Sequence, residues 1–268
     1  MQIQQIEELL GELRTYGYVV LENVFGPVLR DRLVAVTNHL LDRERPLPGN
    51  HFEGYDNRKV LNLLAKNRIF EDLPVNPEVL GLVERFLGRG LLLSSISSLY
   101  VAPGEDAQPL HSDDQAIRVA RHPDFPTVCT TVWALDDMTE LNGTTTIVPR
   151  SHLLPERLRW TDSAGRAGSR PIQVPQGSVL VFDGACHHGA GANRSAAVRK
   201  ALTVSYCAGF IRPVENLHLG VPLTVTASFS PRLLDLCGFV PYEGIHGHVD
   251  RCAPLDALAL ETSRDQGS

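Results

Sequence analysis

After Gly90 the chain becomes a series of short segments rich in Val, Ile, Thr and Leu, separated by Pro-Gly, Asn-Gly, Gln-Gly and Asp-Gly turns. This pattern of short β-branched segments and turns predicts antiparallel β-strands. Helical periodicity comes first and the strands follow, an order that favours a closed jelly roll buttressed by helices over alternating βαβ units. The expected strands cover 91–102, 127–134, 144–149, 171–174, 178–182 and 201–210.

The first ninety residues are predicted to be mainly helical, because apolar residues recur there at helical spacing. The expected helices cover 3–16, 27–41 and 77–87, with one short strand over 17–22. We therefore expect one domain over 1–268. Its parts are a helical N-terminal buttress at about 1–90, a jelly-roll core at about 91–215 and a C-terminal lid or tail at about 216–268.

Composition narrows the class of partner. The 268 residues carry a net charge of -6, and no run of Lys or Arg is long enough to follow a phosphate backbone. We therefore expect a small-molecule partner and no nucleic acid or membrane. The N-terminus lacks the pattern of a secretory signal, and the five cysteines are scattered, so a cytoplasmic protein with reduced thiols is expected. The oligomeric state stays open between monomer and homodimer.

Three residues have the chemistry of a metal site. His111 and Asp113 are two apart, so on a strand they leave from the same face. His188 follows far downstream, after a predicted strand and a Gly-containing turn. Two imidazoles and one carboxylate on one face of a divalent metal are typical of non-haem Fe(II) oxygenases. The sequence thus predicts His111, Asp113 and His188 as metal ligands.

The segment from His188 to Arg199 is expected to form a β-hairpin whose turn centres between Asn193 and Arg194. In this register His188 lies opposite Arg199 on one face, and the adjacent His187 points away. A metal ligand beside a fixed cation makes a site for an anionic chelator. The same alternation places Ala201, Thr203 and Ser205 inward, and Leu202, Val204 and Tyr206 outward.

These segments resemble the phytanoyl-CoA dioxygenase family of Fe(II)- and 2-oxoglutarate-dependent oxygenases. The resemblance runs from about 17 to 247, and is sharpest in 108–113 (QPLHSD), 142–152 (NGTTTIVPRSH) and 188–195 (HGAGANRS) with Arg199. It implies a double-stranded β-helix, a cupin-like jelly roll. Arg150 departs from the family pattern, since many members have Gly there.

The resemblance also implies cofactors and roles. His111, Asp113 and His188 would bind Fe(II), and Arg199 would pair with the distal carboxylate of 2-oxoglutarate. The reaction would use dioxygen, release succinate and carbon dioxide, and oxidise an unactivated C–H bond of the substrate. An acid at position 113 disfavours a halogenase. Further residues that the resemblance places at the cosubstrate or substrate are Gln108, Thr145, Trp133 and Asn62.

The substrate is expected to be a small, fairly apolar molecule, such as a secondary-metabolite intermediate that is hydroxylated, desaturated, epimerised or cyclised. The pocket walls are expected from 51–67, 114–126 and 229–248, which contain Phe52, Tyr55, Ile117, Phe125, Phe239 and Tyr242. Three alternatives stay open: a cupin-like metal or small-molecule binding protein without turnover, an acyl-CoA hydroxylase, although no basic cluster suits the CoA phosphates, and a metal-independent barrel enzyme such as an isomerase.

Overall fold

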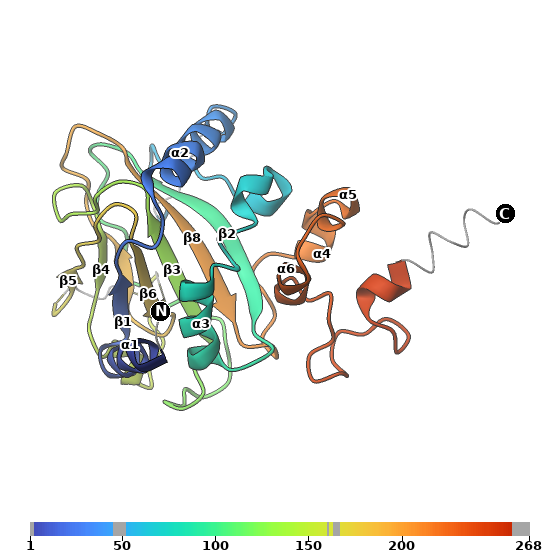
Figure 1. The fold of residues 1–268 in the computed structure, drawn as a ribbon. Coiled ribbons are helices and arrows are strands. Elements are labelled where there is room, and N and C mark those ends of the chain that lie inside the picture. The colour runs from blue at the N-terminus through green and yellow to red at the C-terminus, as the bar shows by residue number, and fades with distance from the viewer. Residues whose placement is uncertain (1–2, 45–51, 160, 163–166, 259–268) are drawn as a thin grey trace.

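The computed structural model describes residues 3–44, 52–159, 161–162 and 167–258 (Figure 1). His51, expected at a pocket wall, lies outside them. Three helices have the bounds that periodicity predicts: α1 (Ile3–Tyr16), α2 (Pro27–Leu41) and α3 (Pro77–Leu87). Helix α3 begins where the Asn76 side chain accepts from the backbone N–H groups of Glu78 and Val79, and it ends at Gly88. Two 3₁₀ turns, η1 (Leu63–Ala65) and η2 (Arg68–Phe70), connect α2 to α3.

Two antiparallel sheets form the jelly-roll body. The larger sheet has the order β1-β6-β3-β8-β2 and the smaller sheet β5-β4-β7. The larger contains β1 (Tyr18–Leu21), β2 (Leu92–Val101), β3 (Val128–Ala134), β6 (Val179–Asp183) and β8 (Arg199–Cys207). The smaller contains β4 (Thr145–Ile147), β5 (Arg170–Pro171) and β7 (His188–Ala190). The expected double-sheet architecture is confirmed.

Apolar residues pack on both faces of the larger sheet. On the outer face Trp133, Leu202 and Tyr206 join helix residues such as Leu13 and Leu82 in one core. On the inner face a smaller cluster, which includes Val132, Ile147 and Phe182, fills the space between the sheets. The molecule is therefore layered as helices, large sheet and small sheet (Figure 1).

The predicted hairpin between His188 and Arg199 is wrong. Strand β7 pairs with β4 in the small sheet, whereas β8 pairs with β2 and β3 in the large sheet. The connection crosses between the sheets because fully buried Asn193 holds it: the Asn193 amide donates to the carbonyls of Val101 and Ala197 at 2.9 Å. Sequence symmetry about a turn cannot reveal such an anchor.

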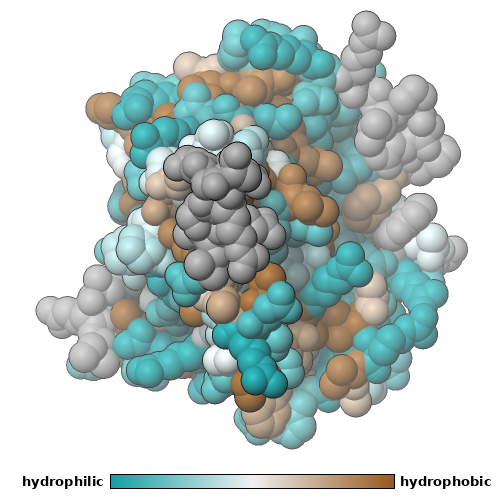
Figure 2. Space-filling view, turned by 90° about the vertical axis from the view of Figure 1, so that its right-hand side faces the viewer, coloured by the Kyte–Doolittle hydropathy of each residue, from teal (hydrophilic) through white to brown (hydrophobic). Residues whose placement is uncertain are grey.

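The short helices α4 (Leu217–Gly220), α5 (Leu223–Thr226) and α6 (Pro231–Leu236) follow β8, and residues 254–258 are also helical. They lie beyond β2, which is an edge strand of the large sheet (Figure 1). Figure 2 views the molecule from this side and shows hydrophilic and hydrophobic side chains interspersed. Within the described ranges, no helix has both the length and the apolar character that a membrane span requires.

Candidate metal centre and cosubstrate pocket

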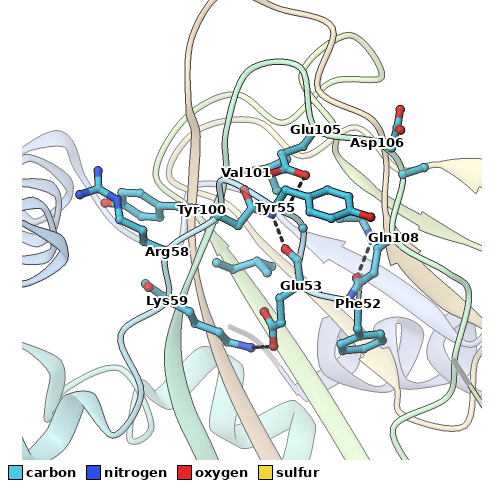
Figure 3. A pocket seen from close by; sticks show the side chains of 16 residues that line it. Phe52, Glu53, Tyr55, Arg58, Lys59, Tyr100, Val101, Glu105, Asp106 and Gln108 are labelled. Carbon is cyan, nitrogen blue, oxygen red and sulfur yellow. Dashed lines mark hydrogen bonds and ion pairs between the residues drawn. The ribbon is translucent and has the colours of Figure 1, made fainter. Parts of the chain in front are cut away.

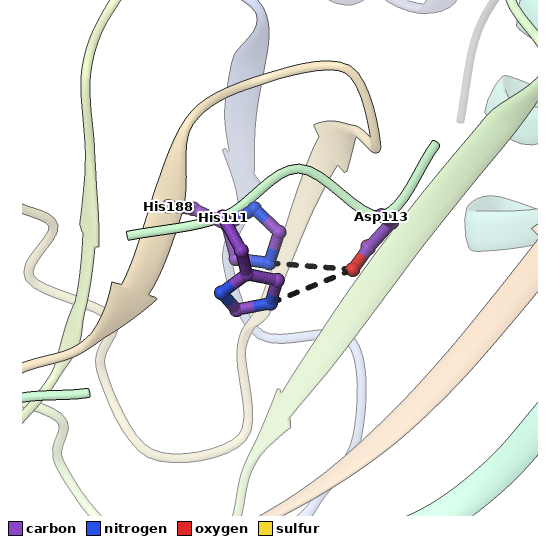
Figure 4. A group of neighbouring side chains, drawn as sticks. All are labelled: His111, Asp113 and His188. Atoms are coloured by element: carbon purple, nitrogen blue, oxygen red, sulfur yellow. Dashed lines mark ion pairs between the residues drawn. The ribbon is translucent and has the colours of Figure 1, made fainter. Parts of the chain in front are cut away.

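His111, Asp113 and His188 come together in space. Ligand atoms from the three side chains all lie within 4.8 Å of one another. The Nε2 atoms of His111 and His188 lie 3.8 and 3.6 Å from Oδ1 of Asp113, and Figure 4 shows both rings directed at this oxygen. Two nitrogens and one oxygen thus converge on a space the size of one cation.

Backbone pairing explains the convergence. His111 and His188 are direct antiparallel partners, since each backbone N–H donates to the other residue's carbonyl, at 2.9 and 2.8 Å. Partners in such a pair present their side chains on the same face of the sheet. The Asp113 N–H donates to the Gly184 carbonyl at 2.7 Å. Strand pairing, rather than the expected hairpin, therefore positions the ligands.

Hydrogen bonds orient the three side chains. Nδ1 of His111 donates to the Pro109 carbonyl at 3.2 Å, and Nδ1 of His188 to the Cys186 carbonyl at 3.0 Å. Each Nε2 is then left with a lone pair for a metal. Asp113 Oδ2 accepts from the Thr130 hydroxyl at 2.6 Å. Burial, together with the charge on His188, lowers the pKa of His111 to about 4, so this imidazole is neutral at neutral pH and ready to ligate.

Arg121 fixes the backbone that carries two of these ligands. Its guanidinium donates to both oxygens of buried Asp114, at 2.6 and 2.8 Å, and to Ser112 Oγ at 3.1 Å. Its remaining donors meet the carbonyls of Leu154 and Glu156, both at 2.9 Å. All five N–H groups of Arg121 are thus satisfied, and Arg157 Nε lies 3.1 Å from Asp114. We call Ser112, Asp114, Arg121 and Arg157 the arginine clamp. No sequence pattern predicted this cluster.

A cavity of about 400 Å³ opens beside the metal ligands. We call it the main cavity. Hydroxyl side chains from three neighbouring strands line one wall, since Ser95 is paired with Ser205, Ser205 with Thr130, and Ser97 with Thr203. The predicted alternation along β8 is confirmed, because Thr203 and Ser205 face the cavity whereas Leu202, Val204 and Tyr206 belong to the outer core.

Arg199 lies fully buried on the inner face of β8. Its guanidinium donates to the Leu99 carbonyl at 3.2 Å and to the Gly143 carbonyl at 3.0 Å, and its Nε has no partner. Burial lowers the pKa of Arg199 to about 10, so the group keeps its charge at neutral pH. Within the described ranges no carboxylate contacts it, and Asp136, which acts on it from a distance, is paired with Arg30. A buried cation without an anion indicates an anionic ligand.

The other predicted pocket residues divide into two groups. Gln108 and Thr145 line the main cavity, and the Gln108 side-chain oxygen accepts from the Ala190 N–H at 3.1 Å. Trp133 is placed elsewhere: it lies in the outer core, because β3 turns it to the opposite face from Val132. Asn62 also stays outside, since its amide donates to the Gly220 carbonyl at 2.7 Å next to α4.

Two of the six residues expected in the pocket walls line the main cavity. These are Phe52 and Ile117. Phe52 and Gln108 also line a small adjoining pocket, where Figure 3 shows them next to each other. Tyr55 lines the same small pocket, Phe125 is exposed, Phe239 belongs to the core, and Tyr242 lines a different cavity.

His187 and Arg150 are close in sequence to the expected site residues, and neither belongs to the ligand cluster. His187 is half-buried, and its Nε2 has no hydrogen-bond partner in the described part of the chain. Its side chain is absent from the ligand cluster, as the prediction required. Arg150 has a φ of 66°, which is the left-handed region that favours glycine. This conformation accounts for the glycine expected at that position by resemblance.

Comparisons with known proteins agree with this geometry. The family model for phytanoyl-CoA dioxygenase (PhyH) matches residues 13–201. Dioxygenase af480 of Aspergillus fumigatus is 30% identical over 67% of this chain and 58% of its own length, and dioxygenase cdmA of Talaromyces verruculosus is 35% identical over 53% and 48%. The chain therefore spans about half the length of these two relatives. Dioxygenase ALT11 of Alternaria alternata is 27% identical over 87% of this chain and 82% of its own.

Solved structures show the same fold. The epimerase SnoN, in complex with Fe3+, alpha ketoglutarate and nogalamycin RO, superposes with a TM-score of 0.67 at 22% identity, over 80% of this chain and 88% of its own. The alpha ketoglutarate dependent carbocyclase SnoK from nogalamycin biosynthesis gives a TM-score of 0.66 at 22% identity, over 81% and 92%. The cupin-like jelly roll is thereby confirmed.

Proposed function

The chain belongs to the phytanoyl-CoA dioxygenase family, and on this premise we propose that it is an Fe(II)- and 2-oxoglutarate-dependent oxygenase acting on a small molecule. The observation that carries the proposal is one combination: a His-Asp-His cluster and, on the same inner surface, a fully buried arginine without an anion. The cluster alone would suit several metals. The added cation selects a cosubstrate with a carboxylate.

The residues present fit both groups. Two imidazoles and one carboxylate on one side suit ferrous iron and leave its other positions open. The Arg199 guanidinium would pair with the distal carboxylate of 2-oxoglutarate. Leu99, whose carbonyl accepts from Arg199, lines the main cavity together with Gln108 and Thr145. When bound, iron with 2-oxoglutarate and dioxygen supplies an oxidant able to attack an unactivated C–H bond, with release of succinate and carbon dioxide.

The chain's own residues hold and shield this centre. The Pro109 and Cys186 carbonyls fix both imidazoles, and Thr130 fixes the carboxylate. The rings of Phe52 and Phe182 pack on His111 and His188, with centroids 4.8 and 4.5 Å apart. Apolar rings at this position keep bulk water away from the ligands, which strengthens electrostatic interactions there.

The comparisons support a tailoring reaction in secondary metabolism. The solved epimerase and carbocyclase are described as enzymes of nogalamycin biosynthesis. Hydroxylation, desaturation, epimerisation and cyclisation all start from the same C–H oxidation, so each stays within the proposal. The five cysteines are free, which supports a cytoplasmic location. A monomer or homodimer would serve this chemistry equally.

Anaerobic titration tests the proposal. Addition of Fe(II) and 2-oxoglutarate together should give a weak visible charge-transfer band, and admission of oxygen should yield succinate. Zn(II) in place of Fe(II) is the matched control and should give neither. A band without succinate would identify a binding protein, and activity that survives a chelator would identify metal-independent chemistry; either result would overturn the proposal.

A further inference from the structure

A second cavity, of about 310 Å³, adjoins the main cavity. Arg212 and Val214 line both cavities, so they mark the junction between them. The second cavity lies between the segment that follows β8 and the C-terminal segment, which contributes Val240, Tyr242 and His246. Arg212 therefore stands where a molecule that fills the main cavity would emerge.

Arg212 is exposed to solvent at this junction. In the described part of the chain no acidic side chain forms an ion pair with it, and no acceptor forms a hydrogen bond with its side chain. Glu215 is the nearest acid along the chain, but its carboxylate accepts from the backbone N–H of Ile96 at 3.1 Å instead. Lys59, the other cation at the main cavity, is paired with Glu53 at 3.1 Å (Figure 3).

A charge balance indicates what is missing, and this step rests on the proposed function. The two charges of ferrous iron and the charge of Arg199 would balance the two charges of 2-oxoglutarate and the charge of Asp113. Asp113 is the only acidic side chain among the described residues that line the main cavity. With the centre balanced and Lys59 paired, Arg212 is the cation at the main cavity that has no carboxylate partner among the described residues; the acid Glu215 lines only the second cavity.

Arg212 has both apolar and polar neighbours. Its chain neighbours Ile211 and Val214 line the main cavity, as do Ile117 and Val128, whereas Glu215 and Asn216 line the second cavity. An apolar wall binds a hydrocarbon or aromatic skeleton. A guanidinium binds a carboxylate through two parallel N–H donors.

We infer that the substrate is a monoanion: an apolar skeleton whose carboxylate, or an anionic group of similar shape, binds Arg212 at the junction of the two cavities. The reacting carbon then lies in the main cavity near the metal ligands. Substituents beyond the anionic group enter the second cavity, against Tyr242 and His246. The charge at Arg212 selects the substrate and fixes which end of it approaches the metal.

Matched acids and amides test this inference. The probes are 2-naphthoic acid with 2-naphthamide, 1-adamantanecarboxylic acid with its amide, and decanoic acid with decanamide. Each is titrated calorimetrically into anaerobic protein saturated with Fe(II) and 2-oxoglutarate. We expect at least one acid to bind about fivefold or more tightly than its amide. Arg212→Gln should remove this preference, and Arg32→Gln, at an exposed position of α2, should keep it.

The possible outcomes separate this inference from the proposed function. A visible band and succinate from the wild-type protein, with equal affinities in every pair or no acid bound, would overturn the inference alone. An acid preference that persists in Arg212→Gln would also overturn it. Absence of both band and succinate would overturn the proposed function and this inference with it.

Discussion

Arg121 and Arg199 are both withdrawn from solvent near the metal ligands, but their surroundings differ in charge. Arg121 is 9% exposed and meets Asp114, which is 1% exposed, through two oxygens, and all its donors have acceptors. Among the described residues Arg199 meets two carbonyls and no acid, and its Nε is left without a partner. The first arginine has a structural role, whereas the role we propose for the second is to bind an anionic ligand.

The difference shows how to tell a structural cation from a binding one. Burial costs free energy in both places, but at Arg121 the protein supplies the counter-charge itself. At Arg199 the counter-charge must come from outside, so the cost of burial becomes selectivity for an anion. This criterion does not apply at the cavity junction, because Arg212 is exposed; there Arg212 differs from Lys59 only in that no described acid pairs with it.

Loss of a metal ligand should have the largest effect. His188→Ala removes one of three donors, so Fe(II) binding and succinate formation should disappear. His187→Ala is the matched control at the next position and should retain most of both, because its ring lies outside the cluster. Metal content after dialysis and succinate yield measure the two variants. The reverse pattern would assign the third ligand to His187.

Arg121→Met should have the next largest effect, on stability. It leaves Asp114 buried with only Arg157 nearby, so the free energy of unfolding should fall by about 3–5 kcal/mol. Arg68→Met breaks an exposed ion pair with Glu71 and should cost far less. Urea unfolding of both metal-free variants gives the comparison. Equal losses would show that the arginine clamp does not compensate buried charge.

Arg199→Met should act on the cosubstrate instead. Removal of an uncompensated buried cation should leave the unfolding free energy unchanged or raise it. The affinity for 2-oxoglutarate should fall by about 2–5 kcal/mol, because the distal carboxylate loses its partner. Calorimetric titration of the metal-loaded protein measures this loss. A destabilisation as large as that of Arg121→Met would end the contrast between the two arginines.

Asp183→Asn should change stability in a way that depends on pH, because burial favours the protonated carboxyl of Asp183. Burial raises the pKa of Asp183 to about 7. The folded state therefore holds a proton between about pH 4 and 7 that the unfolded chain releases, and stability falls as pH rises through this window. Asp183→Asn should gain stability relative to wild type at pH 7.5 but not at pH 4.5. Urea unfolding at both pH values tests this, and a pH-independent difference would contradict it.

Much of the fold could be predicted because its signals are local. Helices α1, α2 and α3 follow from periodicity and capping, and the alternation of Thr203 and Ser205 against Val204 and Tyr206 follows from strand geometry. The metal ligands could be predicted from residue type and spacing. Long-range pairing could not: His188 faces His111 rather than Arg199, because buried Asn193 sends the chain to another sheet.

Only some of the pocket residues expected from the resemblance line the main cavity, because their positions also depend on long-range pairing. Thr145 and Gln108 lie on segments fixed next to the ligands by β7, so their positions hold. The position of Trp133 depends on which face of β3 its side chain occupies. The position of Asn62 depends on where the turn at η1 meets α4. Neither is encoded in a short motif. The clamp of Arg121 and Asp114 left one signal, an acid directly after a ligand, but its partner loop at 154–158 could only be found in three dimensions.

The mutual hydrogen bonds between His111 and His188 have a consequence for biosynthesis. His111 and Asp113 leave the ribosome well before His188, and β7, which carries His188, pairs with β4 and forms a bridge to His111. A nascent chain therefore offers iron two donors at most until β7 has been made and paired. Capture of iron by all three donors therefore has to wait for this pairing, so a chain that retains the metal has already brought its two distant ligand segments together.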